Sequence, residues 1–299
     1  MRRLTGLQKI STEWNGWNKK ETDIRDLSAA IEVEASSIKH LEIPNIGLVY
    51  PQSSFIISKM DELKTLAIMP FGVHTGATPR FKLNRVFFRS PVSQDSLTFW
   101  LSSSQDTLRS LSLVMNYSNP VKVDMFPNLS TLNLILSDRR LLAISSASPF
   151  GVFISATEDV LKSARSLPIK TLSLTLDSVE LAKALSARSI LSSLPLTLLS
   201  LGTVPQLLTD VDLASLFPKN RSSPCPSLKR LSILPPTFYH VIGIDEYDDL
   251  VVTFKRLSEM FRKNGIQVQV DVGVEDEQGF DHADVFAFGR GRSEIGACD

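Results

Sequence analysis

The 299-residue sequence contains very little cysteine, and Cys225 and Cys298 are its only two. They lie far apart and form no Cys-x-x-Cys pair, so a disulfide framework is excluded and two reduced thiols are expected. The sequence also lacks the run of about 18 apolar residues that a membrane-spanning helix requires. Its first residues lack the apolar core of a signal peptide. We therefore expect an intracellular protein, cytoplasmic or nuclear, with no membrane partner.

Net charge is absent as well, because 32 Lys and Arg residues balance 32 Asp and Glu residues. Proteins that hold nucleic acid through bulk charge are strongly basic, so the sequence argues against a nucleic-acid partner. The sequence has no Walker A loop, no Gly-x-Ser-x-Gly elbow and no His-Glu-x-x-His helix. Its four histidines are scattered, whereas a metal site needs converging ligands. We predict no enzymatic activity, no catalytic residues, no metal site and no cofactor.

What the sequence does contain is a repeat. A six-residue pattern with apolar residues at its first, fourth and sixth positions begins at Ile38, Leu63, Leu83, Leu108, Leu129, Ile169, Leu196 and Leu228. A weaker copy begins at Leu7, and a degenerate one uses Ile266 and Val268. The starting positions of the clear copies differ by 20 to 40 residues. Several of these intervals fall within the period of about 20–29 residues that is typical of leucine-rich repeats.

The spacing indicates what each repeat forms. Its fourth and sixth residues share one face of a short strand, and its first residue turns inward just before the strand begins. One repeat cannot bury these side chains alone, but stacked repeats can. We predict an α/β leucine-rich-repeat solenoid, a curved horseshoe with a parallel concave sheet and with helices or irregular segments on the convex side. The residues expected in its core are Leu41, Ile43, Leu66, Ile68, Leu111, Leu113, Leu132, Leu134, Leu172, Leu174, Leu199, Leu201, Leu231 and Ile233.

The segments between the copies show helical spacing. The apolar positions that predict helices are Leu97, Trp100 and Leu101 after a Ser93 N-cap; Val160, Leu161, Ala164 and Leu167; Ala182, Leu185 and Ser189; Leu207, Leu208 and Val211; and Leu250, Phe254, Leu257 and Phe261 before a stop at Gly265. We interpret residues 137–156 as an inserted loop or an unrecognised repeat. The predicted solenoid covers residues 1–272, with 248–272 as its capping repeat, and 273–299 are expected to form a flexible tail.

The residues between the inward-facing ones are expected on the concave face. One strand, in the middle of the sheet, should carry Arg85, Phe87 and Arg89 there. Arginine and aromatic residues are enriched at binding hot spots, and solenoids use their concave sheets to bind partners. The alternative is that the loop at 72–80 covers Phe87, which then packs within the protein. The full predicted protein-binding surface consists of Arg85, Phe87, Arg89, Met69, His40, Glu42 and Arg230.

The irregular repeats, the opening stretch at 14–17 and the copy at Leu228 with its following helix resemble the leucine-rich-repeat region of F-box proteins, especially the divergent fungal ones. The resemblance covers residues 1–272. It implies a non-catalytic protein–protein interaction scaffold, which would be the substrate-recognition part of an F-box-type ubiquitin ligase adaptor. The F-box itself is not recognisable in this chain. Cullin-type ligase subunits are therefore expected as partners only if an F-box lies upstream.

The residues leave two other functions open. One is a hydrolase-like enzyme, because the members of a Ser-His-Asp site can lie far apart in a sequence. The other is a truncated repeat array without a partner. A deep pocket that holds His, Ser and Asp within hydrogen-bond reach would indicate the enzyme. An exposed apolar edge and sensitivity to proteases would indicate the truncated array.

Overall fold

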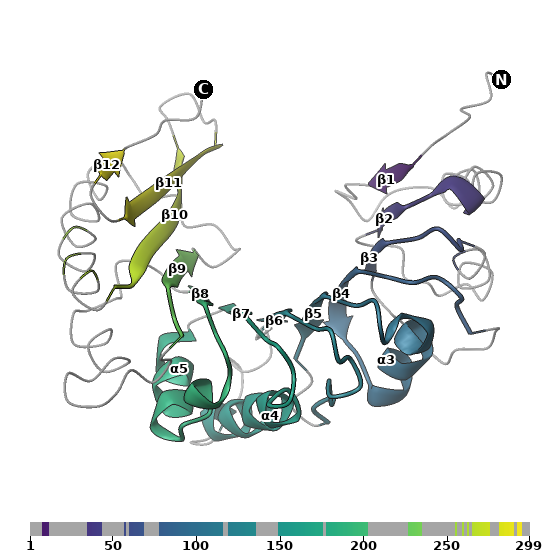
Figure 1. The fold of residues 1–299 in the computed structure, drawn as a ribbon, viewed down its shortest axis with the longest axis horizontal. Helices are drawn as coiled ribbons and strands as arrows, with labels where there is room; N and C mark the ends of the chain where they lie inside the picture. The colour runs from purple at the N-terminus through teal and green to yellow at the C-terminus, as the bar shows by residue number, and fades with distance from the viewer. Residues whose placement is uncertain are drawn as a thin grey trace. The chain divides into compact units, whose positions relative to one another are not determined.

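The computed structural model describes residues 8–11, 35–43, 57, 60–68, 78–115, 119–135, 149–175, 178–202, 227–234, 255, 259, 262, 265–275, 281–289 and 292–294. The chain divides into two compact units, residues 1–132 and 133–299. Both units are α/β, and in each the strands that follow one another along the chain lie next to one another (Figure 1).

Five parallel strands form the sheet of the first unit. Its elements are β1 (Lys9–Ser11), η1 (Ala35–Ser37), β2 (His40–Ile43), β3 (Thr65–Ile68), β4 (Arg85–Pro91), α3 (Gln94–Leu101), η2 (Ser102–Ser104) and β5 (Ser110–Val114). Each strand from β1 to β5 pairs in parallel with the next. The following strand, β6 (Thr131–Ile135), spans the boundary between the units. The predicted parallel sheet is thus confirmed within this unit.

The register of the strands follows the apolar pattern of the sequence. Leu41 is paired with Leu66, Leu66 with Val86, and Val86 with Leu111. The predicted core residues with described side chains are all buried: Leu41, Leu66, Ile68, Leu111, Leu113, Leu132, Leu134, Leu172, Leu174, Leu199, Leu201, Leu231 and Ile233. The side chain of Ile43 lies outside the described residues. Alternation along each strand therefore places these core residues on one face of the sheet, and we call the opposite face the outward face.

A backbone hydrogen-bond pattern recurs from one repeat to the next. The carbonyl of Lys39, the second residue of its repeat, accepts hydrogen bonds from the N–H groups of Lys64 (2.8 Å) and Thr65 (3.1 Å). The equivalent carbonyls of Lys64, Asn84, Arg109, Lys170 and Thr197 each accept two bonds from the equivalent residues of the next repeat. We call this the carbonyl ladder. It fixes the point at which each strand begins relative to the strand before it.

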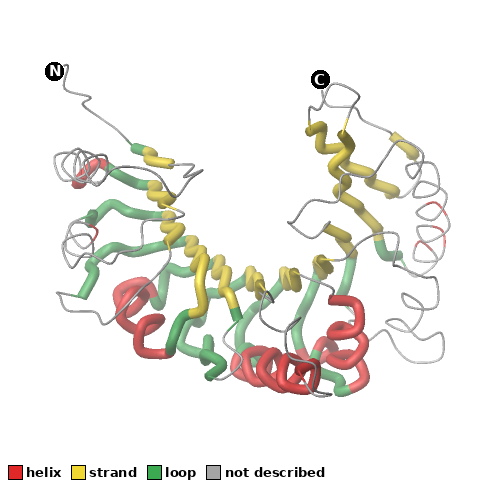
Figure 2. Tube along the Cα trace, turned by 180° about the vertical axis from the view of Figure 1, so that it is seen from behind, coloured by secondary structure: helices red, strands yellow, loops and turns green. Residues whose placement is uncertain are grey.

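The predicted helix after Ser93 is α3. Its N-cap residue Ser93 accepts a hydrogen bond from the backbone N–H of Ser96 at 3.2 Å, which satisfies one of the free donors of the first turn. Leu97, Trp100 and Leu101 are buried, as their spacing predicts. The helix lies to one side of the strands (Figure 2), and only two residues separate it from the end of β4.

The second unit repeats the arrangement and then departs from it. Its elements are α4 (Pro149–Ser163), β7 (Thr171–Thr175), α5 (Ser178–Ala187), η4 (Leu191–Ser193), β8 (Leu198–Gly202), β9 (Arg230–Leu234), β10 (Gln267–Glu275), β11 (Asp281–Gly289) and β12 (Arg292–Glu294). Strands β7 to β10 are parallel, whereas β10, β11 and β12 are antiparallel to one another.

The antiparallel strands lie in the segment for which the sequence predicts a tail, and the sequence does not predict them. Strand β10 contains the predicted strand at 266–270 but continues to Glu275. Residues 276–280 then join it to β11. A connection of this length can only make a hairpin, since a parallel crossover needs a dozen or more residues.

The helices of the second unit agree with the sequence in part. The predicted stripe of Val160, Leu161, Ala164 and Leu167 is buried in and just after α4. Helix α4 begins at Pro149, so the described end of the segment 137–156 is helix and not an inserted loop.

The stripe assigned to α5 is wrong at one residue. Ala182 and Leu185 are buried, but Ser189 is exposed beyond the end of the helix with φ 57°. Of the helix predicted over 250–261, only Lys255 and Glu259 are described, and both are helical. The predicted stop is confirmed, because Gly265 has φ 73° and its N–H donates to Arg262 O at 3.0 Å. The helix expected around 207–211 lies outside the described residues.

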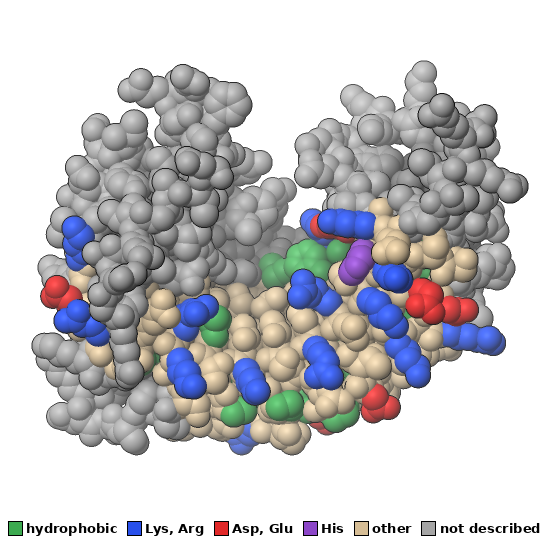
Figure 3. All heavy atoms as spheres, turned by 45° about the horizontal axis from the view of Figure 1, so that its top comes forward, with side chains coloured by type: hydrophobic (Ala, Val, Ile, Leu, Met, Phe, Trp, Pro, Cys, Tyr) green, Lys and Arg blue, Asp and Glu red, His purple; other side chains and the backbone are tan. Residues whose placement is uncertain are grey.

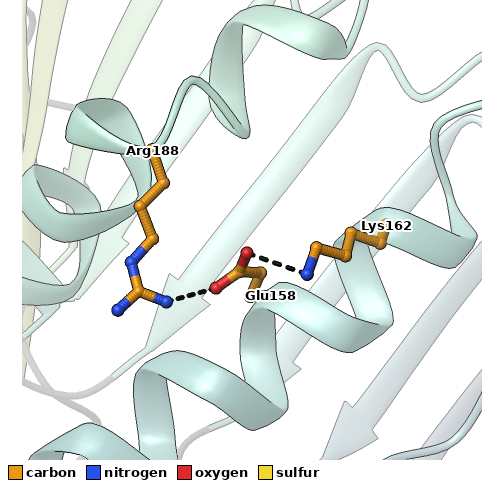
Figure 4. A network of polar contacts seen from close by, with 3 residues as sticks. All are labelled: Glu158, Lys162 and Arg188. Atoms are coloured by element: carbon orange, nitrogen blue, oxygen red, sulfur yellow. Dashed lines mark hydrogen bonds and ion pairs between the residues drawn. The ribbon is translucent and has the colours of Figure 1, made fainter.

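A three-residue charge network joins α4 to the turn after α5 (Figure 4). Glu158 accepts from Lys162 Nζ at 2.9 Å, one helical turn along α4, and from Arg188 Nη1. The Glu158 side chain is 14% exposed, whereas its two partners are about half exposed. The hydrogen bond from Lys162, followed by that from Arg188, holds the pKa of Glu158 below its ordinary value.

Candidate protein-binding site

Strand β4 carries the residues that the sequence selects for binding. Val86 and Phe88 are fully buried, so Arg85, Phe87 and Arg89 alternate with them on the outward face. Arg85 is exposed, and Phe87 and Arg89 are half-buried. Strand β4 lies between β3 and β5, as predicted. The predicted register is therefore confirmed, and Phe87 is not sealed in the core.

Four hydrogen bonds, two of them buried, fix the segment that leads into β4. The Ser104 hydroxyl, fully buried in η2, accepts from Leu83 N–H at 3.0 Å and donates to Phe81 O at 3.1 Å. The Thr107 hydroxyl donates to Leu83 O at 2.9 Å. The Ser103 hydroxyl donates to a further carbonyl, that of Pro79, at 2.6 Å. The start of β4 is thus held by the segment that follows α3.

The pairing of β4 with β5 shifts register where the outward residues lie, and we call this irregularity a bulge. Phe87 is paired with Ser112 on β5, but Pro91 is paired with Val114. From Phe87 to Pro91 the chain advances by four residues on β4, whereas from Ser112 to Val114 it advances by two on β5. This stretch of β4 therefore has two extra residues, and Arg89 lies within it. Bulges bend a strand, redirect side chains and are over-represented next to functional sites. Strand β4 is also longer, at 7 residues, than β3 or β5, which have 4 and 5.

Arg89 is held by two neighbours on the outward face. Its Nη2 donates to Glu42 Oε1 at 2.6 Å, across the intervening strand β3, where Ala67 lies in register between the two outer strands. Its guanidinium carbon lies 5.0 Å from the centroid of the Phe87 ring, which is a cation–π contact. Ala67 is paired with Glu42 and with Phe87, and Arg89 lies two residues beyond Phe87, so the contact runs diagonally over β3.

The ion pair of Arg89 is only partly covered. The Arg89 and Glu42 side chains are 31% and 42% exposed. A pair as exposed as this contributes about 0–1 kcal/mol to stability. Arg89 Nε is shielded from solvent and has no hydrogen-bond partner among the described residues. The arrangement is therefore a weakly stabilising cluster that holds a guanidinium and an aromatic ring in fixed positions at the surface.

The other predicted binding residues are dispersed. His40 is exposed at the start of β2, two residues before Glu42. Arg230 is exposed at the start of β9, in the second unit. Met69 lies outside the described residues. The structure thus brings together Phe87, Arg89 and Glu42, which we call the β4 cluster, with Arg85 beside it on the same strand.

The contact between Arg89 and Glu42 was missed by sequence reasoning. The sequence predicts that both residues belong to the binding surface, but as separate positions on strands that are not adjacent. The available signal is an acidic outward residue on β2 and a basic outward residue on β4, two repeats apart.

No model of a known protein family matches the chain. The search of curated proteins likewise found no significant match. Within the described part of the chain, no group of three or more His, Cys, Asp or Glu side chains is placed to hold a metal ion. No helix among those same residues is long and apolar enough to cross a membrane.

Proposed function

We propose that the chain is a non-catalytic repeat scaffold of the leucine-rich-repeat type, whose outward sheet face binds a protein partner. The observation that carries this proposal is the β4 cluster. It presents an aromatic ring and a guanidinium, the side chains that dominate binding hot spots, on a strand with a bulge. Its Arg89 is already oriented by Glu42, so less side-chain entropy is lost when a partner binds.

The repeat architecture supports the same proposal. The carbonyl ladder and the buried leucines recur in both units, as expected for stacked repeats that share a core. Solenoids of this kind use their sheet faces to bind extended surfaces of partners. The resemblance to F-box proteins makes this role more specific. On that basis we propose that the scaffold recognises substrates for a cullin-type ubiquitin ligase if an F-box lies upstream of the repeats.

The proposal is tested by affinity capture from the source cell with a Phe87→Ala, Arg89→Ala variant. We expect the variant to fold, because neither side chain is fully buried, and to lose the proteins that the wild type captures. The matched control is Phe99→Ala, Arg165→Ala, which also removes a half-buried aromatic and an arginine but away from the outward face. The control should capture as the wild type does. Equal capture by both variants would contradict the proposed site.

The ligase role has its own readout. Cullin-type subunits should be captured by a protein that includes the upstream F-box, and the Phe87→Ala, Arg89→Ala variant should keep them while losing other proteins. Loss of the cullin-type subunits in this variant would contradict the assignment of the β4 cluster to substrate recognition.

A further inference from the structure

A cationic side chain stands at or just before the start of each of the first five strands. These residues are Lys9 on β1, Lys39 before β2, Lys64 before β3, Arg85 on β4 and Arg109 before β5. We call them the cationic strip. Figure 3 shows Lys and Arg side chains recurring over the described surface, with a histidine among them. The strip lies at the edge where the strands begin, and its Arg85 lies two residues before Phe87 of the β4 cluster on the same strand.

The backbone beneath the strip is fixed. The carbonyls of Lys39, Lys64 and Arg109 belong to the carbonyl ladder, so these residues occupy equivalent places in successive repeats. Neighbouring strands lie about 4.8 Å apart, so five strands span about 19 Å. The strip therefore carries one cation per strand: Lys39, Lys64 and Arg109 at equivalent positions, and Lys9 and Arg85 one residue further into their strands.

The charges of the strip are not neutralised within the described structure. Lys9, Arg85 and Arg109 are exposed, and Lys39 and Lys64 are partly so. Among the described residues, none of these five side chains has an ion-pair partner. A row of like charges repels itself, and an anionic ligand relieves that repulsion.

The acidic residues of the described first unit form no ion pair with the strip. Glu42 is held by Arg89 on the outward face. Asp61 and Glu62 lie in the turn before β3, and Asp106 lies in the turn before β5. Asp95 and Asp124 belong to α3 and to the segment between β5 and β6. Among the described residues, the five cations of the strip are thus not paired with a carboxylate, although the whole chain has no net charge.

We propose that the cationic strip binds an acidic segment of the protein partner in extended conformation, lying across the starts of β1 to β5. This inference rests on the proposed function, whose partner it describes further. An extended peptide advances about 3.3 Å per residue, so about six residues match the 19 Å of the strip. Carboxylates along that segment complement the five cations and give a contact that weakens as salt is added.

The described surface favours an acidic peptide over single-stranded nucleic acid. Proteins that bind single strands combine a basic groove with aromatic rings on which bases stack. Phe87 is the single aromatic residue among the described outward positions of β2 to β5, and its ring is in contact with Arg89. A peptide needs no stacking surface.

The test uses fluorescence anisotropy with a fluorescein-labelled peptide of ten glutamates, a ten-glutamine peptide and a ten-nucleotide oligo-dT strand. We expect the glutamate peptide to bind, the glutamine peptide not to bind, and salt to weaken the complex. Lys39→Glu, Lys64→Glu, Arg109→Glu should lower the affinity for the glutamate peptide by at least about tenfold, because three attractions become repulsions. A control with the same change in charge, Arg80→Glu, Lys122→Glu, Arg165→Glu, should bind within about twofold of the wild type.

Three results would overturn the inference: no binding of the glutamate peptide, an equal loss of affinity in the control, or tighter binding of oligo-dT. If charge reversal unfolds the chain, the glutamine variants at Lys39, Lys64 and Arg109 replace it, with the same expected direction. Partner capture separates the two proposals. If capture depends on Phe87 and Arg89 but not on the strip, the proposed function stands and the inference about the strip is refuted. If capture depends on neither set of residues, both proposals are refuted.

Discussion

The most direct test of how β4 is positioned is the substitution Ser104→Ala. It removes the hydroxyl that accepts from Leu83 N–H at 3.0 Å and donates to Phe81 O at 3.1 Å, at a site with no solvent exposure. A buried donor that loses its partner costs about 1–3 kcal/mol, and the carbonyl loses its donor as well. We therefore expect the free energy of unfolding to fall by about 2–4 kcal/mol, with the larger part from the Leu83 N–H.

Urea denaturation measures this change, and Ser103→Ala is the matched control. Ser103 lies next to Ser104 and also donates to a carbonyl, that of Pro79, but it is exposed, so its loss should cost less than about 1 kcal/mol. Hydrogen exchange at the Leu83 amide gives a local readout, and exchange should be at least about tenfold faster in Ser104→Ala. A Ser104→Ala protein as stable as the Ser103→Ala control, with unchanged protection of Leu83, would refute this reasoning.

Two further predictions concern the core and the charge network. Leu132→Ala removes a side chain with no solvent exposure and should lower the free energy of unfolding by about 2–5 kcal/mol; an unchanged urea midpoint would exclude Leu132 from the core. Glu158→Gln should destabilise the protein at pH 7 but not at low pH. Because the folded-state pKa of Glu158 is lowered, its stabilising contribution is complete above the ordinary glutamate pKa of about 4.3 and is lost as the pH falls through the folded-state value. Unfolding curves of Glu158→Gln and of the exposed neighbour Asp159→Asn, measured from pH 7 to pH 3, check this, and a difference from wild type that does not change with pH would contradict it.

Much of the sheet could be predicted from the sequence because its side chains follow a simple rule. An apolar pair two residues apart must share a face of a strand, and eight copies make chance alternation an inadequate explanation. The same rule placed Phe87 outward, since Val86 and Phe88 had to face the core. The α3 helix could be predicted equally well, because the Ser93 N-cap and the spacing of Leu97 and Trp100 are local signals in the sequence.

Features that depend on several distant residues could not be predicted. The bulge in β4 is a shift of register between β4 and β5, so it depends on both strands and no single residue of β4 predicts it. The ion pair of Arg89 with Glu42 joins strands two repeats apart, and so depends on how β2 and β4 both pair with β3. The hairpin of β10 and β11 follows from the shortness of residues 276–280, but the mixed charges and glycines of that segment indicated a tail instead.

The carbonyl ladder has a consequence for which insertions and deletions the chain can tolerate. The starting positions of the clear repeats differ by 20 to 40 residues, yet the same carbonyl of a repeat receives the same two donors in both units. Residues added to the segments that return from one strand to the next leave these bonds in place. One residue added between the second and fourth positions of a repeat would instead move the following side chains to the opposite face of the sheet. Related sequences should therefore vary in length between the strands and keep an unbroken count of residues from each ladder carbonyl into its strand.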